Sequence, residues 1–357
     1  MLLKSFLENS FSLLQGSSVY QMGAAYNLNS NIGKKKHIID KLLENNKINV
    51  MDIGCRGGGT PELVFLYKHI NLIGFDADKD EVDNLNGNKE LASQFNKVVF
   101  YNYALDAEEG IKTLYLTRSL GSSSLYRPNS KYKSLFSSGS ALDVMSEIQL
   151  KTEKLDVVIG KEMIKDIDFI KLDTQGTELN ILKGAEKSLL PNILMVESEV
   201  EFQEMYENQP LFPELDIFLR EHNFTLLYLN RVYERISTLN SNKYGYSKGL
   251  LTFGDVLYVK SISASQDFTS EKIVKFIVLL ANYGYYDYAR EVFKLNESKL
   301  SEYAPLLKQL LQVNNSKLSF ILGFVFAFIV DWLVFFLLKL RGWNYQGSDS
   351  DRSYPIQ

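Results

Sequence analysis

Residues 50–60 read VMDIGCRGGGT, a short apolar run that stops at an acid and continues into four glycines within six positions. In an open α/β sheet the first strand ends at such a turn, because small residues let the backbone bend and approach a ligand. The next residues, Thr60, Pro61 and Glu62, suit the cap, the first position and the first turn of a helix. The stretch therefore predicts a strand, a ligand-facing turn and a helix N-terminus.

Strand-like runs alternate with helical patterns from about Ile48 to Lys260, which is typical of βαβ units around a mostly parallel sheet. The last two runs are joined without an obvious crossover helix, so we expect an antiparallel last strand. The predicted fold is α/β and Rossmann-like, with a seven-stranded, mostly parallel sheet. The runs expected to form its strands are 48–54, 71–78, 97–105, 168–173, 192–202, 224–230 and 254–260.

Composition and charge narrow the choice of partners. The 357 residues carry a net charge of -4 and are 45% hydrophobic, so most of the chain is expected to fold. The concentrated basic run is Lys34 to Lys36, which indicates a solvated helix face, so nucleic acid is not an expected partner. The single cysteine, Cys55, excludes an internal disulfide and a thiolate zinc site, and it fits a reducing compartment.

Three successive strand ends carry residues suited to S-adenosylmethionine. Asp52 lies beside the glycine turn, where it can attract a cationic head group, and Asp76 lies where such folds bind ribose hydroxyls. NAD(P) or another nucleotide, and a sheet without a ligand, are the alternatives; the fingerprint GxGxxG is not met, because Arg56 replaces its second glycine. The expected cofactor-binding residues are Asp52, Gly54, Cys55, Arg56 and Gly57 at the first strand end, Asp76 at the second, and Asn102, Ala104 and Leu105 at the third.

The chain resembles the FkbM-type methyltransferases over roughly residues 48–230. Residues 168–185, DFIKLDTQGTELNILKGA, are similar to the family's D-x-x-G-x-E-x-x-x-L-x-G segment. Residues 197–229 are similar to its E-x-E-F, Y-x-x-Q and L-F-x-E run, and GSSSLYRP at 121–128 resembles the substrate-side loop of one branch. The resemblance implies a class I methyltransferase fold and transfer of methyl from S-adenosylmethionine to hydroxyl groups, often of polysaccharides, other glycans or natural products.

Methyl transfer to a hydroxyl needs a group that removes the proton, and a carboxylate is the expected one. Asp173 ends the fourth predicted strand at the edge where ligands bind, and Glu178 follows after a glycine turn. These two residues are the predicted catalytic pair. The alternative role for Glu178 is to neutralise the start of its own helix. The three histidines, His37, His69 and His222, are expected at the surface.

Glu197, Glu199 and Glu201 alternate along one predicted strand and therefore share a face, where unpaired carboxylates would repel one another. Sugar hydroxyls, a basic side chain such as Arg127 or a divalent cation can neutralise them. We predict no metal site, because no His or Asp pattern accompanies them. A flexible loop for the serines and core packing for Tyr206 are the alternatives to acceptor binding. The expected acceptor-binding residues are Ser123, Ser124, Tyr126, Arg127, Glu197, Glu199 and Tyr206.

The C-terminal third of the chain has helical and long apolar patterns in place of the strand-like runs of the predicted sheet. Residues 318–338 are apolar over a length that crosses a bilayer, and the single acid Asp331 does not outweigh them. A buried helix in an oligomer interface is the alternative. The expected organisation is an N-terminal helical segment at 1–47, a methyltransferase domain at 48–261, a helical appendage at 262–315, a membrane helix at 316–340 and a flexible tail at 341–357.

Together these predictions describe a membrane-tethered O-methyltransferase that acts on a glycan, glycolipid or related hydroxyl-bearing acceptor, with an oligomer possible. Because the cofactor is made in the cytosol, the catalytic domain is expected in the cytoplasm and the residues after 338 on the far side of the membrane. The alternative is a non-catalytic scaffolding protein that kept the nucleotide-binding fold and recruits partners at a membrane.

Overall fold

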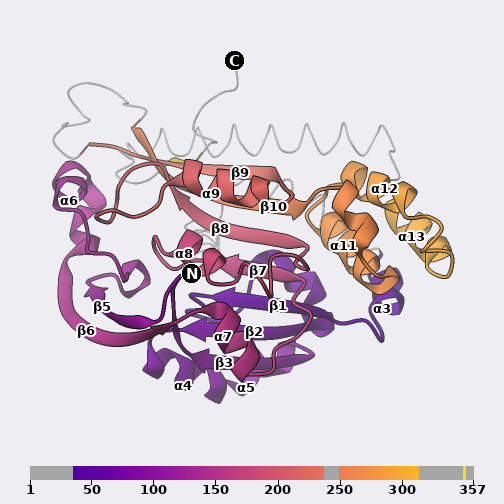
Figure 1. The fold of residues 1–357 in the computed structure, drawn as a ribbon, viewed down its shortest axis with the longest axis horizontal. Coiled ribbons are helices and arrows are strands. Elements are labelled where there is room, and N and C mark those ends of the chain that lie inside the picture. The colour runs from indigo at the N-terminus through magenta and orange to yellow at the C-terminus, as the bar shows by residue number, and fades with distance from the viewer. Residues whose placement is uncertain (1–34, 237–248, 313–348, 351–357) are drawn as a thin grey trace, which may run out of the picture.

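The computed structural model describes residues 35–236, 249–312 and 349–350. Its large sheet has the strand order β11-β9-β10-β8-β7-β1-β2-β3 (Figure 1). The seven predicted strands are all present, because buried strands of this kind appear in the sequence as nearly continuous apolar runs. They are β1 (Ile48–Ile53), β2 (Ile70–Asp76), β3 (Lys97–Asn102), β7 (Phe169–Leu172), β8 (Met195–Glu201), β9 (Phe224–Glu234) and β10 (Leu250–Lys260).

The strand directions follow the prediction. The pairs β1 with β2, β2 with β3, β1 with β7 and β7 with β8 are all parallel. Strand β10 is antiparallel to both β8 and β9, so the last long strand alone reverses the direction of the sheet. The carboxyl ends of the parallel strands therefore meet at one edge, where ligands bind in open α/β sheets.

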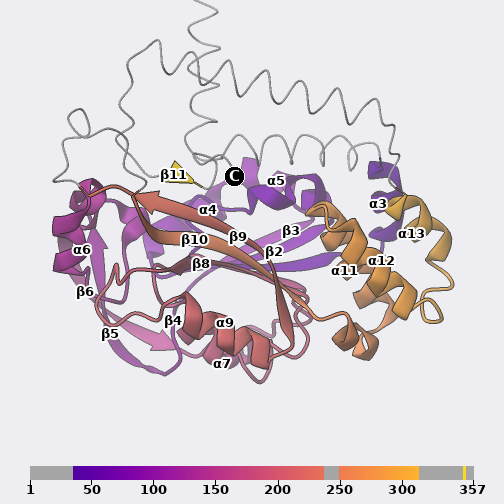
Figure 2. The ribbon, with the colours of Figure 1, turned by 90° about the horizontal axis from the view of Figure 1, so that it is seen from above.

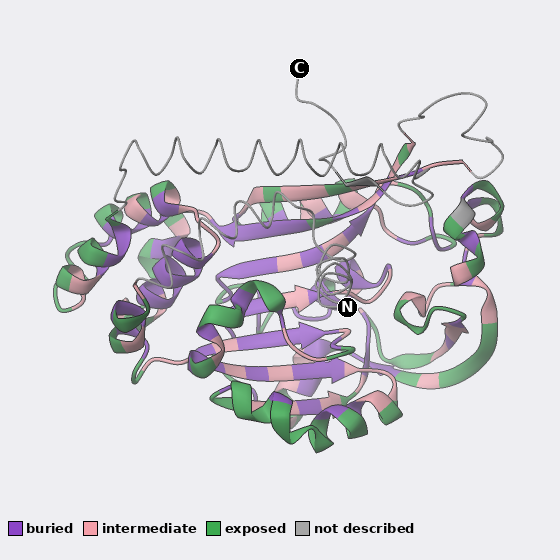
Figure 3. Cartoon of the chain, turned by 180° about the vertical axis from the view of Figure 1, so that it is seen from behind, coloured by how far each residue is buried: buried purple, intermediate pink, exposed green. Residues whose placement is uncertain are grey.

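Helices cover both faces of the large sheet, and the strands between them are buried (Figure 3). One face packs under α7 (Leu155–Lys161), α8 (Glu178–Lys183) and α9 (Phe212–Glu221). The opposite face packs under α3 (Lys36–Leu42), η1 (Pro61–His69), α4 (Lys79–Gly87), α5 (Lys89–Gln94) and the C-terminal helices.

A second, three-stranded sheet of order β4-β6-β5 was not predicted. It consists of β4 (Ala104–Leu105), β5 (Gly110–Thr117) and β6 (Val144–Glu153), with η2 (Leu120–Ser122), α6 (Ser130–Leu135) and η3 (Ser137–Leu142) between β5 and β6. Most of β6 is exposed, so it lacks the apolar run that marks the buried strands. This arm lies at the end of the large sheet away from α11–α13 (Figure 1).

The residues predicted as a helical appendage do form helices, η4 (Ser263–Asp267), α11 (Ser270–Asn282), α12 (Tyr286–Leu295) and α13 (Ala304–Leu311). They lie side by side at one end of the large sheet (Figure 2). Residues 273–282 of α11 are all buried, and their apolar side chains share one core with β1, β7, β8 and β10. The helices therefore extend the core of the sheet.

A buried ion cluster fastens α11 to the sheet. Asp168, which precedes β7, is fully buried and lies 2.8 Å from Lys272 Nζ and 2.9 Å from Lys275 Nζ, both on α11. It also accepts a hydrogen bond of 2.8 Å from the Asn49 amide of β1. One carboxylate thus joins three elements and leaves neither ammonium unpaired.

The predicted membrane segment, 318–338, lies outside the described residues, as do residues 1–34 of the predicted N-terminal segment. Among the helices that the structure describes, none is long and apolar enough to cross a bilayer. Strand β11 (Asp349–Ser350) pairs with Tyr233 and Val232 of β9. Residues 349–350 therefore lie beside the catalytic sheet. The expectation that residues after 338 lie across a membrane depends on a segment outside the described residues and stays a prediction.

Candidate active site

The glycine turn begins where β1 meets β7. Gly54 has φ +80°, and a Cβ atom there would lie 1.9 Å from the carbonyl oxygen of Asp173, so no other residue fits. The amides of Gly54 and Cys55 both donate to the Phe75 carbonyl oxygen, at 2.9 and 3.3 Å. The first glycine therefore allows close strand packing, and these two amides are not free for a ligand.

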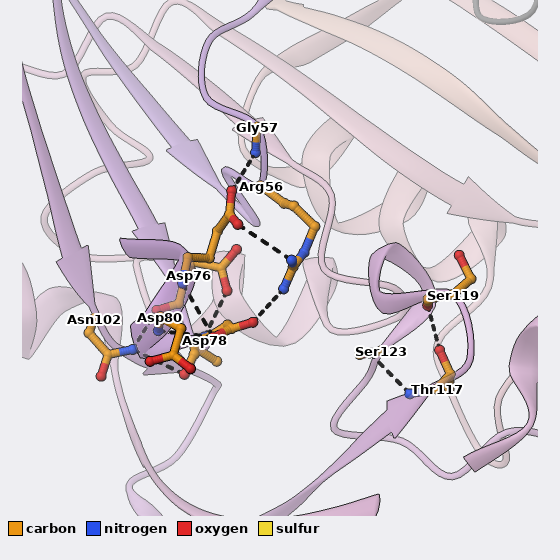
Figure 4. Close-up of polar contacts among 11 residues, drawn as sticks. Arg56, Gly57, Asp76, Asp78, Asp80, Asn102, Thr117, Ser119 and Ser123 are labelled. Carbon is orange, nitrogen blue, oxygen red and sulfur yellow. Dashed lines mark hydrogen bonds and ion pairs between the residues drawn. The ribbon is translucent and has the colours of Figure 1, made fainter. Parts of the chain in front are cut away.

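The rest of the turn is also bonded within the protein (Figure 4). The Gly58 amide donates to the Cys55 carbonyl at 2.8 Å, and the Gly57 amide donates to Glu81 Oε1 at 2.9 Å. The Arg56 guanidinium lies 2.7 Å from Asp78 and 3.5 Å from Glu81. The amides of Gly54, Cys55, Gly57 and Gly58 thus have partners within the protein, and their contact with the cofactor stays a prediction. What the turn does offer is open space at Gly57, where a Cβ atom would meet nothing within 4 Å.

Three of the predicted cofactor residues face the core. The Cys55 thiol is buried against Gly74 of β2, and burial raises the pKa of this thiol far above its usual range. Ala104 and Leu105 are buried in β4. The thiol and the amide of Cys55 are therefore occupied within the protein. The Ala104 and Leu105 side chains pack in the interior next to the site.

The predicted helix after the turn is a 3₁₀ helix, η1, with Pro61 in its first turn. Thr60 occupies the cap position of η1, as predicted, but its side chain makes no capping hydrogen bond. The Thr60 side chain is buried instead, since only 2% of it is exposed. Glu62 lies in the first turn of η1, as predicted.

Asp52, at the end of β1, is the residue of this region that most needs a partner. It is 1% exposed, and its Oδ1 has no hydrogen-bond partner among the described residues. Burial raises the pKa of Asp52 to about 6, although Lys171 opposes the rise. A buried oxygen without a partner is costly, and a ligand ammonium would satisfy it directly or through water.

Asp76 lies at the tip of β2, and its Oδ1 accepts from the Asp78 amide at 2.8 Å. Burial raises the pKa of Asp76, while that hydrogen bond and Arg56 oppose the rise. The exposed Asn102 of β3 donates at 3.0 Å to the carbonyl oxygens of Asp76 and Ala77 (Figure 4). Asn102, a predicted cofactor-binding residue, therefore holds the strand end that presents Asp76.

The turn after β7 contains a residue that sequence reasoning missed. Gln175 has φ 59°, in the left-handed region, and its side-chain amide donates to Asp173 at 3.1 Å and to Glu199. Its side-chain oxygen lies 2.9 Å from the Tyr206 hydroxyl, and its main-chain oxygen accepts from Ser124 at 2.6 Å. Gln175 thus brings together a predicted catalytic residue and three predicted acceptor residues.

Glu178 begins α8 and is 3% exposed. Its carboxylate accepts from the Thr174 amide at 2.7 Å, the Thr174 hydroxyl at 3.0 Å and the Gly176 amide at 2.9 Å. Burial raises the pKa of Glu178 to about 7, against the effect of these donors. With both oxygens occupied, Glu178 fastens the turn, whereas Asp173 has an exposed side-chain fraction of 41%.

The three glutamates of β8 have different surroundings. Glu197 accepts from the Tyr283 hydroxyl at 2.6 Å, and Glu199 accepts from Gln175. Glu201 is 2% exposed, and its Oε1 has no partner among the described residues. Burial raises the pKa of Glu197 to about 8 and holds the pKa values of Glu199 and Glu201 well above their usual range. Over the described part of the chain, no three His, Cys, Asp or Glu side chains converge as metal ligands would.

The predicted acceptor loop lies only partly at the site. Ser124 and Tyr206 are buried beside Gln175, and the Tyr206 hydroxyl also lies 2.9 Å from the Ser122 carbonyl. Ser123 accepts from the Thr117 amide at 3.2 Å (Figure 4). Tyr126 accepts from Asn180 at 2.9 Å. Arg127 points outward, because it pairs with Glu147 at 3.2 Å and lies over the Tyr115 ring, so it does not neutralise the β8 glutamates.

Residues 63–226 match the model of the family described as the methyltransferase FkbM domain. The match covers 164 of the 357 residues and shows an FkbM-type methyltransferase domain within the chain. The matched residues of this FkbM domain contain Asp76, Asp173, Gln175, Glu178 and the β8 glutamates. Among curated protein sequences, none matches the chain significantly.

Solved structures show a distant likeness to this FkbM protein. Magnesium protoporphyrin IX methyltransferase from Synechocystis PCC 6803, with bound SAM, has 12% identity and a TM-score of 0.32 over 68% of this chain and 82% of that chain. TrmK of M. capricolum, with S-adenosylhomocysteine, has 12% identity and a TM-score of 0.29 over 76% and 92%. Likeness at this level carries no argument about the reaction.

The cofactor is S-adenosylmethionine, in keeping with the methyltransferase domain matched at residues 63–226. The residues present fit it. Asp52 offers a buried oxygen without a partner for the ammonium, Asp76 offers a carboxylate at the strand tip for the ribose, and the surface at Gly57 is open. The turn amides of the predicted set have partners within the protein, so these three features carry the fit.

Proposed function

We propose that this S-adenosylmethionine-dependent methyltransferase transfers the methyl group to an oxygen, on a hydroxyl of a glycan, glycolipid or related acceptor. The observation that supports this most is the arrangement around Asp173. This partly exposed carboxylate stands at the carboxyl edge of the sheet, beside the cofactor-binding Asp52, and one of its oxygens is fixed by Gln175. A fixed carboxylate with access to solvent is suited to take a proton from a hydroxyl.

When bound, S-adenosylmethionine supplies a methyl group whose bond to the sulfonium breaks as the acceptor oxygen forms its bond to the carbon. In the proposed role, Asp173 accepts the hydroxyl proton. Glu199, held at the same Gln175 amide, has its pKa raised by burial and by Asp173, so it is suited to remain protonated and donate to the acceptor. Two neighbouring carboxyl groups would then have opposite roles.

The acceptor class is tested by incubating the enzyme and labelled cofactor with fractionated cell glycans. Label that appears in a glycan fraction and survives mild base, as an ether does, supports O-methylation of a hydroxyl. Label that hydrolyses in mild base indicates a carboxyl ester, and label found only in protein or nucleic acid contradicts the proposed acceptor.

Asp76→Ala is expected to weaken S-adenosylmethionine binding by about 10- to 100-fold, because the ribose loses an acceptor that is a charged carboxylate. Titration calorimetry measures the change, with Asp80→Ala in the first turn of α4 as the matched control. Unchanged affinity in Asp76→Ala would contradict its role. Absence of binding by the unmodified protein would favour the scaffolding alternative.

We also propose that residues 318–338 attach the enzyme to a membrane surface without crossing it, with the catalytic domain in the cytoplasm. The apolar length of the segment supports attachment, and the pairing of β11 with β9 supports a tail on the catalytic side. The full chain is expected to sediment with membranes, and a 1–315 truncation is expected to stay in the supernatant. In sealed vesicles, protease added outside should cleave a C-terminal tag and the catalytic domain together. Protection of the tag alone would mean that the segment spans.

A further inference from the structure

Lys171 of β7 carries an ammonium group near the carboxyl edge of the sheet, and its side chain is 22% exposed. Within the described part of the chain, its Nζ donates no hydrogen bond, and its closest ion pair is with Asp173, whose Oδ2 lies 3.9 Å away. The ammonium groups of Lys272 and Lys275, in contrast, lie 2.8 and 2.9 Å from Asp168. An ammonium has three donor hydrogens, so Lys171 keeps its donors for water or for a ligand.

The neighbouring strand β1 carries the complementary group. Asp52 is in register with Lys171, and register partners on adjacent strands point to the same face of a sheet. Oδ1 of Asp52 is buried and has no hydrogen-bond partner among the described residues. Asp52 and Lys171 nevertheless form no ion pair with each other in the described structure. Buried groups of opposite charge are usually paired, so their separation indicates a ligand that contacts both.

The other carboxylates beside Lys171 have donors of their own. Glu197 of β8, in register with Lys171 on its other side, accepts a hydrogen bond of 2.6 Å from the Tyr283 hydroxyl. Asp173 accepts a hydrogen bond of 3.1 Å from a side chain of its own turn. Of the two register partners of Lys171, Asp52 is therefore the one with a buried oxygen that no donor of the described residues meets.

Both groups are charged at neutral pH, and their spacing is fixed. Burial raises the pKa of Asp52 to about 6, which leaves its carboxylate ionised. Burial lowers the pKa of Lys171, but Asp52 and the other nearby carboxylates raise it above its ordinary value. Gly54 packs so closely on the Asp173 carbonyl that the ends of β1 and β7 are held together. A ligand therefore meets a negative and a positive group that are already in place.

The amino-acid part of S-adenosylmethionine matches this pair, because its ammonium and its carboxylate are attached to the same carbon atom. We propose that Lys171 binds this carboxylate while Asp52 binds the ammonium, so that β1 and β7 together recognise the zwitterion. The reverse arrangement would place like charges next to each other. The inference concerns the cofactor and not the acceptor, so it goes beyond the proposed O-methylation and does not depend on it.

The test compares S-adenosylmethionine with decarboxylated S-adenosylmethionine, which keeps the ammonium and the sulfonium and lacks only the carboxylate. The unmodified protein is expected to bind S-adenosylmethionine about 10- to 100-fold more tightly in titration calorimetry, the effect of hydrogen bonds to a charged group. Lys171→Met keeps the length of the side chain and removes its charge. It is expected to weaken S-adenosylmethionine by the same factor and not to weaken the decarboxylated form.

Three controls separate this role from a loss of structure. 5′-Methylthioadenosine carries neither the ammonium nor the carboxylate, so Lys171→Met should bind it as the unmodified protein does. Asp52→Asn is the matched variant on the other strand, and it should weaken S-adenosylmethionine and its decarboxylated form alike, because both carry the ammonium. Lys171→Arg retains the positive charge and should keep a preference for S-adenosylmethionine.

Two results would overturn the proposal. The first is equal affinity of the unmodified protein for the two ligands, a measurement that needs no variant to fold. The second is a Lys171→Met variant that binds S-adenosylmethionine as before or binds both ligands more weakly by the same factor, because the effect would then not involve the carboxylate.

Discussion

Asp173→Asn is expected to lower methyl transfer by about 10²- to 10⁴-fold while cofactor affinity changes little, because the variant keeps the size of the side chain and loses its basicity. Gln175 donates to Oδ1 of this partly exposed carboxylate, and Lys171 lies 3.9 Å from Oδ2, so the proposed proton transfer uses a carboxylate that is fixed on one side and reachable from solvent. Single-turnover transfer of labelled methyl to the active glycan fraction measures the first effect, and calorimetry with S-adenosylmethionine measures the second.

Glu178→Gln is the matched comparison for Asp173→Asn. Glu178 accepts three hydrogen bonds from the turn that it follows, so its loss should lower the melting temperature more than the rate per folded molecule. The sequence alone predicts that both residues act in catalysis. Full transfer in Asp173→Asn together with loss of transfer in a stable Glu178→Gln would reverse the assignment made from the structure.

Asp168→Ala is expected to lower the free energy of unfolding by about 3–5 kcal/mol, the usual cost of removing one partner from a buried ion pair. Asp168 is fully buried, and the variant leaves the ammonium groups of Lys272 and Lys275 without their partner. Denaturant unfolding measures the change as a shift of the midpoint. The docking of α11 on the sheet depends on this cluster, so the variant should also expose the helix to proteolysis.

A surface ion pair provides the control for Asp168→Ala. Asp83 pairs with Lys79 four residues earlier on α4, and its side chain is 60% exposed. Asp83→Ala is expected to change the free energy of unfolding by no more than about 0.5 kcal/mol. If both variants lose less than about 1 kcal/mol, the buried cluster contributes little and α11 is held by apolar packing instead.

The sequence is informative about strands that are buried on both faces. Four of the six residues of β1 are apolar, and its burial on both faces is the reason. Strands β5 and β6 give no such run, because they form an arm whose outer surface is exposed. Their hydrogen bonds to each other and to β4 depend on partners far apart in sequence, which periodicity does not reveal.

The site residues at the strand ends can be predicted from the sequence, whereas the hydrogen bonds within the turns cannot. Asp52, Asp76 and Asp173 follow apolar runs, so their place at one edge of a parallel sheet follows from topology. Whether a glycine turn offers its amides to a ligand depends on local partners such as Phe75 and Glu81, which no motif specifies. The left-handed backbone of Gln175 and its contacts with Asp173 and Glu199 arise only in the folded turn, so the sequence does not reveal its role.

The rate at which the single thiol of this chain is alkylated can report local opening of the protein. Cys55 is 2% exposed, between β1 and β2 at the root of the glycine turn. An alkylating reagent can reach it only when those two strands separate, so the labelling rate reports how often that end of the sheet opens. Bound nucleoside should lower the labelling rate of Cys55 by the factor with which it favours the closed form. The labelling rate therefore provides a ligand-binding assay that requires neither a tag nor an acceptor.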